Sequence, residues 1–151
     1  MNRRNIQEEY NMQADICLHI RENYPDVIFL SDGSGIKLPI GLAVKVARLK
    51  SENKVPDLVI LKSNNTYNGI VLELKKSENE IYTKNGTIRQ KKHFLEQLKS
   101  LQMLQADGFF ASFVFSRLHA TVLIDNYMKN YDVSKYVCLE KLCSFSLWKQ
   151  D

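Results

Sequence analysis

Two carboxylates and one lysine occur where this sequence could gather them around a metal ion. Asp57 follows Pro56 at the start of one apolar run, and Glu73 and Lys75 flank Leu74 in the next run. Two carboxylates can hold a divalent cation through oxygen, with waters and a substrate phosphate completing its shell. Such a cation polarises a phosphoryl oxygen and lowers the pKa of a bound water, while a lysine orients that water or stabilises charge on the phosphate. These residue types therefore suit the hydrolysis of a phosphodiester.

The chemistry requires the two apolar runs to bring these side chains together. Side chains alternate along a strand, so Glu73 and Lys75 share one face. Residues 57–61 and 67–76 are separated by a short turn-forming segment, which predicts an antiparallel hairpin. Because the second strand runs back along the first, Asp57 is expected at the same end of the hairpin as Glu73.

Each motif alone has a simpler explanation. A second E-x-K spacing, Glu52-Asn53-Lys54, lies in a polar segment that we interpret as a solvated helix end. An exposed ion pair on an edge strand would also place Glu73 and Lys75 two residues apart. The leading Pro56-Asp57 strand and the intervening turn favour the metal site over these alternatives.

Hydrophobic spacing predicts eight elements in the chain, because helical periodicity and short β-rich runs alternate between turn signals. The helix at 39–51 would have an apolar face of Leu42, Val46 and Leu49. The order α-β-α-β-β-α-β-α predicts an α/β fold with a mixed central sheet flanked by helices. The expected helices are residues 5–23, 39–51, 87–106 and 117–129, and the expected strands are residues 27–30, 57–61, 67–76 and 110–115.

Length and composition indicate one globular domain, residues 1–151. Apolar residues make up 44% and charged residues 25% of the 151, which is ordinary for a soluble protein. No apolar stretch approaches the roughly 20 residues that span a bilayer. The N-terminus lacks the apolar region of a signal peptide, so a cytoplasmic protein is expected.

The remaining polar and aromatic signals are expected to be structural. The three cysteines lack zinc spacing and predict reduced thiols. His93 and His119 have no partner at metal spacing, so both are expected on helix surfaces. The aromatic cluster is expected in the core rather than as a base-stacking platform. The residues concerned are Cys17, Cys138 and Cys143, and Phe109, Phe110, Phe113 and Phe115. Residues 130–151 could not be assigned.

The net charge of +4 favours a polyanionic partner without specifying one. Basic residues concentrate on both sides of the Asp57–Lys75 region, where they could contact DNA phosphates or form an ordinary solvated helix face. No element is built to read base edges, so any recognition is expected to follow backbone charge and DNA shape. The candidates for backbone contacts are Lys45, Arg48, Lys54, Lys91 and Lys92.

These motifs together resemble the PD-(D/E)xK nuclease superfamily. Within it, the chain is most similar to the VRR-Nuc group, particularly its small stand-alone phage and bacterial members. The residues 9–13 resemble that group's early helical E-x-x-x-Q, and residues 93–97 resemble the helix that places a glutamine beside the metal. Residues 110–115 resemble the following strand. The likeness covers roughly residues 7–129 and implies a restriction-endonuclease-like core.

The resemblance also implies roles for individual residues. Asp57 and Glu73 would bind Mg²⁺ or Mn²⁺, with the Leu74 carbonyl as a further ligand, and Lys75 would be the catalytic lysine. Gln97 would assist from the flanking helix, unless it is an ordinary exposed glutamine. Glu9 would supply the acidic residue of the first helix and would be a further metal ligand. Glu8 competes with it for that role, and an acid near a helix N-terminus can also serve the helix dipole alone.

The expected activity is therefore that of a divalent-metal-dependent DNA endonuclease, acting in the host cytoplasm if phage-encoded. The resemblance extends to branched-DNA processing in repair or recombination by homodimers, so flapped or junction DNA is a plausible substrate. Two other classes stay open. One is a nucleic-acid-binding protein with this fold and no turnover, and the other is an accessory protein of a replication or recombination assembly.

Overall fold

The computed structural model describes residues 3–33 and 38–134. Its element order is the expected one, with a short 3₁₀ helix added before the third helix. The elements are α1 (Arg3–Asn23), β1 (Phe29–Ser31), α2 (Ile40–Ala47), β2 (Leu58–Ile60), β3 (Ile70–Leu74), η1 (Glu78–Glu80), α3 (Lys92–Ala106), β4 (Phe110–Val114) and α4 (Arg117–Met128). No helix of these ranges is long and apolar enough to cross a membrane.

The four strands form one mixed sheet in the order β1-β2-β3-β4. β2 and β3 pair antiparallel, with Leu58 opposite Leu72, which confirms the expected hairpin. β3 and β4 pair in parallel, with Leu74 opposite Val114. Parallel neighbours need a crossover connection, and α3 lies within it. β3 is therefore an interior strand, and the alternative of an exposed edge-strand ion pair is wrong.

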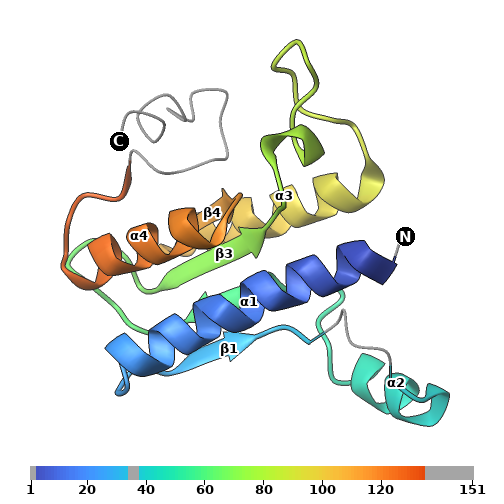
Figure 1. The fold of residues 1–151 in the computed structure, drawn as a ribbon, viewed down its shortest axis with the longest axis horizontal. Coiled ribbons are helices and arrows are strands. Elements are labelled where there is room, and N and C mark those ends of the chain that lie inside the picture. The colour runs from blue at the N-terminus through green and yellow to red at the C-terminus, as the bar shows by residue number, and fades with distance from the viewer. Residues whose placement is uncertain (1–2, 34–37, 135–151) are drawn as a thin grey trace.

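The two faces of β3 belong to two separate cores, and helices lie on both sides of the sheet (Figure 1). Ile70, Leu72 and Leu74 pack with residues of α1 and α4. Val71 packs on the opposite face with Phe94 of α3 and its neighbours. The alternation expected from the sequence is confirmed. The helices thus form a layer on each side of the sheet, and an interior strand with two apolar faces carries Glu73.

The third helix begins later than expected, at Lys92 instead of Thr87. Residues 81–91 form a hairpin instead, which we call the rim hairpin. Tyr82 pairs antiparallel with Ile88, and the backbone N–H of Thr83 donates to the carbonyl of Thr87 at 2.8 Å. Gly86 has a positive φ of 73°, a conformation that glycine adopts without steric cost. The Asn-Gly turn therefore ends any helix that the surrounding periodicity would favour.

The expected apolar face of α2 does not pack against the sheet. No residue of α2 is buried, and the side chains of Leu42 and Leu49 are 47% and 87% exposed. Both faces of the sheet are already covered by α1, α4 and α3. The sequence showed that the helix has an apolar side, but not that the protein interior has no room for it.

Burial also corrects the expectation for one histidine. His119 is buried instead of lying on the helix surface, and its ring stacks on Phe115 at a centroid distance of 6.0 Å. Burial lowers the pKa of His119 to about 4. His93 is exposed, as expected. Cys17 is a buried free thiol, as expected, whereas Cys138 and Cys143 lie outside the described residues.

The aromatic cluster is confirmed as core. Phe110, Phe113 and Phe115 are buried, and the partly exposed Phe109 packs against the cluster that contains Phe113 and Phe115. A platform for stacking bases would need exposed rings, so these phenylalanines stabilise the fold on both sides of β4.

Candidate active site

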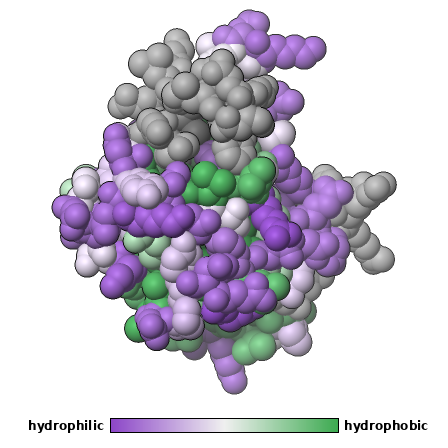
Figure 2. Space-filling model, turned by 60° about the vertical axis from the view of Figure 1, so that its left-hand side comes forward, coloured by the Kyte–Doolittle hydropathy of each residue, from purple (hydrophilic) through white to green (hydrophobic). Residues whose placement is uncertain are grey.

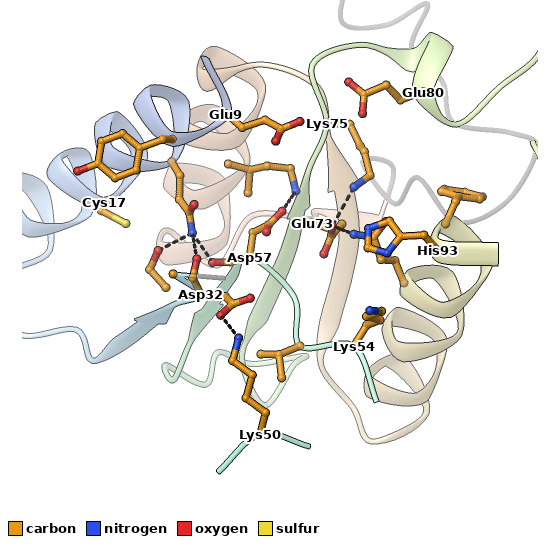
Figure 3. Close-up of a pocket in the computed structure, with 18 of the residues that line it drawn as sticks. Glu9, Cys17, Asp32, Lys50, Lys54, Asp57, Glu73, Lys75, Glu80 and His93 are labelled. Carbon is orange, nitrogen blue, oxygen red and sulfur yellow. Dashed lines mark hydrogen bonds and ion pairs between the residues drawn. The ribbon is translucent and has the colours of Figure 1, made fainter. Parts of the chain in front are cut away.

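A cavity of about 1130 Å³ opens at the carboxyl end of β3 (Figure 3). Its walls come from α1, the segment 50–55 that precedes β2, the end of β3 and the first turns of α3. The cavity thus lies where the two layers of helices meet the sheet. All five catalytic candidates, Glu9, Asp57, Glu73, Lys75 and Gln97, line it.

Asp57 is the residue just before β2, and it lines the cavity. Its Oδ2 accepts a hydrogen bond from the backbone N–H of Leu74 at 2.7 Å. Its own carbonyl accepts from the N–H of Asp32 at 2.9 Å. The hairpin therefore fixes the Asp57 carboxylate beside the end of β3, where the sequence predicted that it would meet Glu73.

Glu73 is held in the interior, with only 3% of its surface exposed. Its Oε1 accepts hydrogen bonds from Lys75 Nζ at 2.8 Å and from Gln97 Nε2. Burial raises the pKa of Glu73 to about 7, and the neighbouring Asp57 carboxylate adds to the rise. Burial likewise raises the pKa of Asp57. Two carboxyl groups in this position repel each other when both are ionised, so a cation between them would be favourable.

Lys75 places a positive charge next to Glu73. It follows the last residue of β3, and its backbone N–H donates to the Val114 carbonyl at 2.8 Å. The Nζ atom lies 5.7 Å from the centroid of the Phe113 ring and forms the ion pair with Glu73. The side chain of Lys75 is only 11% exposed. The strand, and not contact with solvent, therefore directs its ammonium group into the cavity.

Gln97 lines the cavity and is partly buried, so it is not an ordinary exposed glutamine. It lies on α3, and its Nε2 donates a hydrogen bond to Glu73 Oε1 on β3. Its Oε1 is buried and is without a hydrogen-bond partner among the described residues. A buried amide oxygen normally has a partner, so this atom is available to a ligand of the cavity.

Glu9 and not Glu8 faces the cavity. Glu9 lines it, whereas the side chain of Glu8 is 55% exposed. Both lie 3.8 Å from Lys76 Nζ. Burial raises the pKa of Glu9, with Lys76 opposing and Glu80 reinforcing the rise. Of the two glutamates, Glu9 is the one that lines the cavity.

Asp57 and Glu73 form a pair of carboxylates, and Glu9 is a more distant third. Within residues 3–33 and 38–134, no three Asp, Glu, His or Cys side chains are close enough to hold a metal together. Asp57 and Glu73 are brought together, whereas Glu9 interacts with Asp57 through charge alone, because the Asp57 carboxylate contributes to the raised pKa of Glu9. Mg²⁺ typically uses one or two carboxylates and keeps several waters. The Asp57–Glu73 pair, with the free Gln97 oxygen nearby, fits such a cation.

The basic candidates divide into two groups. Lys54 and Lys91 line the cavity, and Lys54 Nζ lies 3.8 Å from Glu96. Lys45 and Arg48 lie on or just after α2 and do not line it, nor does Lys92.

Two residues of the site were not assigned from the sequence. Gln13 lies one helical turn after Glu9, and its Nε2 is 2.7 Å from Ser31 Oγ, 2.9 Å from the Asp32 carbonyl and 3.0 Å from the Asp57 carbonyl. It is the last residue of the E-x-x-x-Q motif at residues 9–13, and that motif was the available signal. Glu80 of η1 also lines the cavity and extends toward the end of β3 from the side opposite Glu9 (Figure 3). No motif marked Glu80.

The fold and site define a class of protein: a mixed α/β domain whose cavity at one end of an interior strand collects carboxylates and a lysine. No protein-family profile matches the sequence, and no curated protein matches it. A solved structure titled "VRR_NUC domain protein" superimposes with a TM-score of 0.53 at 20% identity, covering 82% of this chain and 90% of that chain. The chain therefore has the fold of a VRR_NUC domain, the restriction-endonuclease-like architecture expected from the sequence.

Proposed function

We propose that this protein is a divalent-metal-dependent endonuclease that hydrolyses DNA phosphodiesters. The observation that carries the proposal is the arrangement of Asp57, Glu73 and Lys75 around the end of β3. The buried carboxylate of Glu73, the partly buried carboxylate of Asp57 and an ammonium group converge there, and Lys75 Nζ lies 2.8 Å from Glu73 Oε1. The VRR_NUC fold supports the nuclease assignment, because that domain is named for nuclease function.

Asp57 and Glu73 would hold Mg²⁺ or Mn²⁺, with the Leu74 carbonyl as a further ligand. When bound, the metal would polarise the phosphoryl oxygen and make water a better nucleophile. Glu9 would act at a greater distance, by making the cavity more negative and so favouring a cation.

Lys75 would orient the attacking water and stabilise the negative charge that develops on the phosphate. Glu73 holds its ammonium group in place through one carboxylate oxygen. Gln97 holds the same oxygen from α3, so the position of Glu73 is determined from two sides. A catalytic group that is already in position at the moment of reaction needs little reorganisation.

The substrate would be DNA recognised through backbone charge and shape, because no described element presents side chains for reading base edges. A flapped, branched or junction substrate is part of the proposal, and so is a homodimer that would present two sites to such DNA. Lys54 and Lys91, at the mouth of the cavity, would contact phosphates next to the scissile bond.

The test is a cleavage assay on linear, single-stranded, flapped and four-way-junction DNA, with Mg²⁺, with Mn²⁺ and without either. The comparison includes Asp57→Asn, Lys75→Ala and the control Lys62→Ala. Lys62 is exposed and follows β2 at the end of the strand opposite Asp57. We expect metal-dependent cleavage by the wild type and the control only.

Other outcomes identify other functions. Cleavage that survives both Asp57→Asn and Lys75→Ala would mean that the site is elsewhere. Salt-sensitive DNA binding without cleavage on any substrate would favour a binding protein. If the protein shows no DNA affinity and no response to divalent metals, an accessory protein would be favoured.

A further inference from the structure

The rim hairpin rises directly from the mouth of the cavity. Its flanking residue Glu80 and its last residue Lys91 both line the cavity, so its two ends are anchored at the active site. In Figure 1 the hairpin stands away from the body of the molecule between η1 and α3. It is the highest feature of that view and forms a hydrophilic projection at the top of Figure 2.

The base of the hairpin is part of the core. Ile81 is 1% exposed, and Tyr82 and Ile88 pack against the same apolar cluster. The N–H of Arg89 donates to the Ile81 carbonyl at 2.8 Å, and its side-chain Nε donates to the Asn79 carbonyl at 2.7 Å. The arm is therefore tied to the fold at its base.

The tip of the hairpin is a closed turn whose central residues are exposed. Thr83 and Thr87 join across it through their backbones and through their hydroxyl groups, which lie 2.7 Å apart. Lys84, Asn85 and Gly86 between them are exposed. A closed turn that presents a lysine to solvent is suited to binding an external group, because its backbone is already ordered.

The charge of the hairpin is of one sign. Residues 81–91 include Lys84, Arg89 and Lys91 and no acidic residue, in a chain whose net charge is only +4. Lys92 follows at the start of α3. The cavity beside the hairpin holds acidic side chains, among them Asp57 and Glu73, but also basic ones, among them Lys54 and Lys75. The hairpin adds exposed cations next to this cavity, where they are placed to contact backbone phosphates that flank a phosphate bound inside it.

We propose that the rim hairpin is a DNA-binding arm that holds backbone phosphates of a duplex on one side of the scissile bond. This inference rests on the proposed nuclease function and assigns Lys84 as its outermost contact. Contacts to backbone phosphates are favoured over base stacking, because the exposed tip has no aromatic ring and Tyr82 packs at the base. The arm positions the substrate without reading its sequence.

The test measures binding separately from cleavage. Fluorescence anisotropy of a labelled duplex is recorded in EDTA with the Asp57→Asn protein and over a range of salt concentrations. Lys84→Ala is added to that protein, with Lys62→Ala as the matched control and Lys84→Arg as the conservative replacement. One phosphate contact lowers the slope of log K against log salt by about 0.9, which is roughly an eightfold loss of affinity at about 0.1 M salt.

We expect this loss and the lower slope for Lys84→Ala, wild-type behaviour for Lys62→Ala, and recovery with Lys84→Arg. Equal affinity and slope for Lys84→Ala and Lys62→Ala would overturn the inference, as would a Lys84→Ala effect that Lys84→Arg does not restore. Circular dichroism checks that each variant is folded. The lysine is exposed at a turn, so its loss should not unfold the protein.

Cleavage then separates this inference from the proposed function. With Asp57 intact, Lys84→Ala should raise the KM for duplex substrate and leave kcat close to the wild-type value. If no variant, including the wild type, cleaves DNA while Lys84→Ala still weakens binding, the proposed function fails and the arm is retained. If the wild type cleaves DNA and Lys84→Ala leaves KM unchanged, the arm fails and the proposed function is retained.

Discussion

Glu73 should make the metal-free protein less stable as the pH rises. In the folded protein its pKa is about 7, against 4.5 for an unperturbed glutamate. Between these values the folded state binds a proton that the unfolded state has released. The free energy of unfolding therefore contains a contribution that is complete below about pH 4.5 and is lost as the pH rises through about 7.

The size of the effect follows from the same pKa values. One pKa unit corresponds to about 1.4 kcal/mol, so the change from 4.5 to about 7 amounts to roughly 3 kcal/mol in total. Between about pH 5 and about pH 8, most of it, roughly 2–3 kcal/mol, should be lost. Glu73 is almost fully buried, so solvent screens this contribution little.

Urea denaturation in EDTA at several pH values measures this contribution. Glu73→Gln keeps the shape of the side chain and an oxygen for Lys75 and Gln97, but it cannot titrate. The difference in unfolding free energy between wild type and Glu73→Gln should therefore shift by roughly 2–3 kcal/mol in favour of the variant as the pH rises from about 5 to about 8. Parallel pH profiles for the two proteins would refute the account of Glu73.

Three further changes test the surroundings of the site. Gln13→Leu removes the amide beside the Asp57 carbonyl and should destabilise the protein by roughly 1–3 kcal/mol. It should also raise the Mn²⁺ concentration that gives half-maximal thermal stabilisation. This second effect would be absent if Gln13 were merely structural. Gly69→Ala would place a Cβ 2.7 Å from the Ile60 carbonyl and should cost about 1–3 kcal/mol in urea denaturation. Ser116→Ala removes the side-chain cap of α4 and should cost about 1 kcal/mol, which equal urea midpoints would contradict.

The sequence was informative wherever local pattern and tertiary packing agree. Alternation along residues 70–75 separated the two cores correctly, because an interior strand must bury both faces. The Pro56-Asp57 start and the turn after β2 placed Asp57 beside β3, because an antiparallel hairpin leaves few other registers. These are local constraints, and the order of the elements follows from them.

The sequence was misleading where packing was decided by distant elements. The apolar side of α2 has no partner in the described fold, since other helices already cover the sheet. His119 is buried and its ring stacks on Phe115, which no spacing of histidines indicates. Glu80 lines the cavity from η1, an element that no periodicity predicted. Each result depends on tertiary packing that the local sequence pattern does not encode.

The most direct test of the proposed function is the single-turnover rate of Mn²⁺-dependent cleavage of flapped DNA by the wild type and by Asp57→Asn. The asparagine in Asp57→Asn still has an oxygen that can accept the hydrogen bond from the Leu74 N–H. It has no negative charge, so the cation site is weakened. Loss of a metal ligand or of a group that orients one typically costs about 10–100-fold or more. We expect cleavage by the wild type and a loss of at least this size in Asp57→Asn. Equal rates for the two proteins, at the same metal concentration, would contradict a metal site at Asp57.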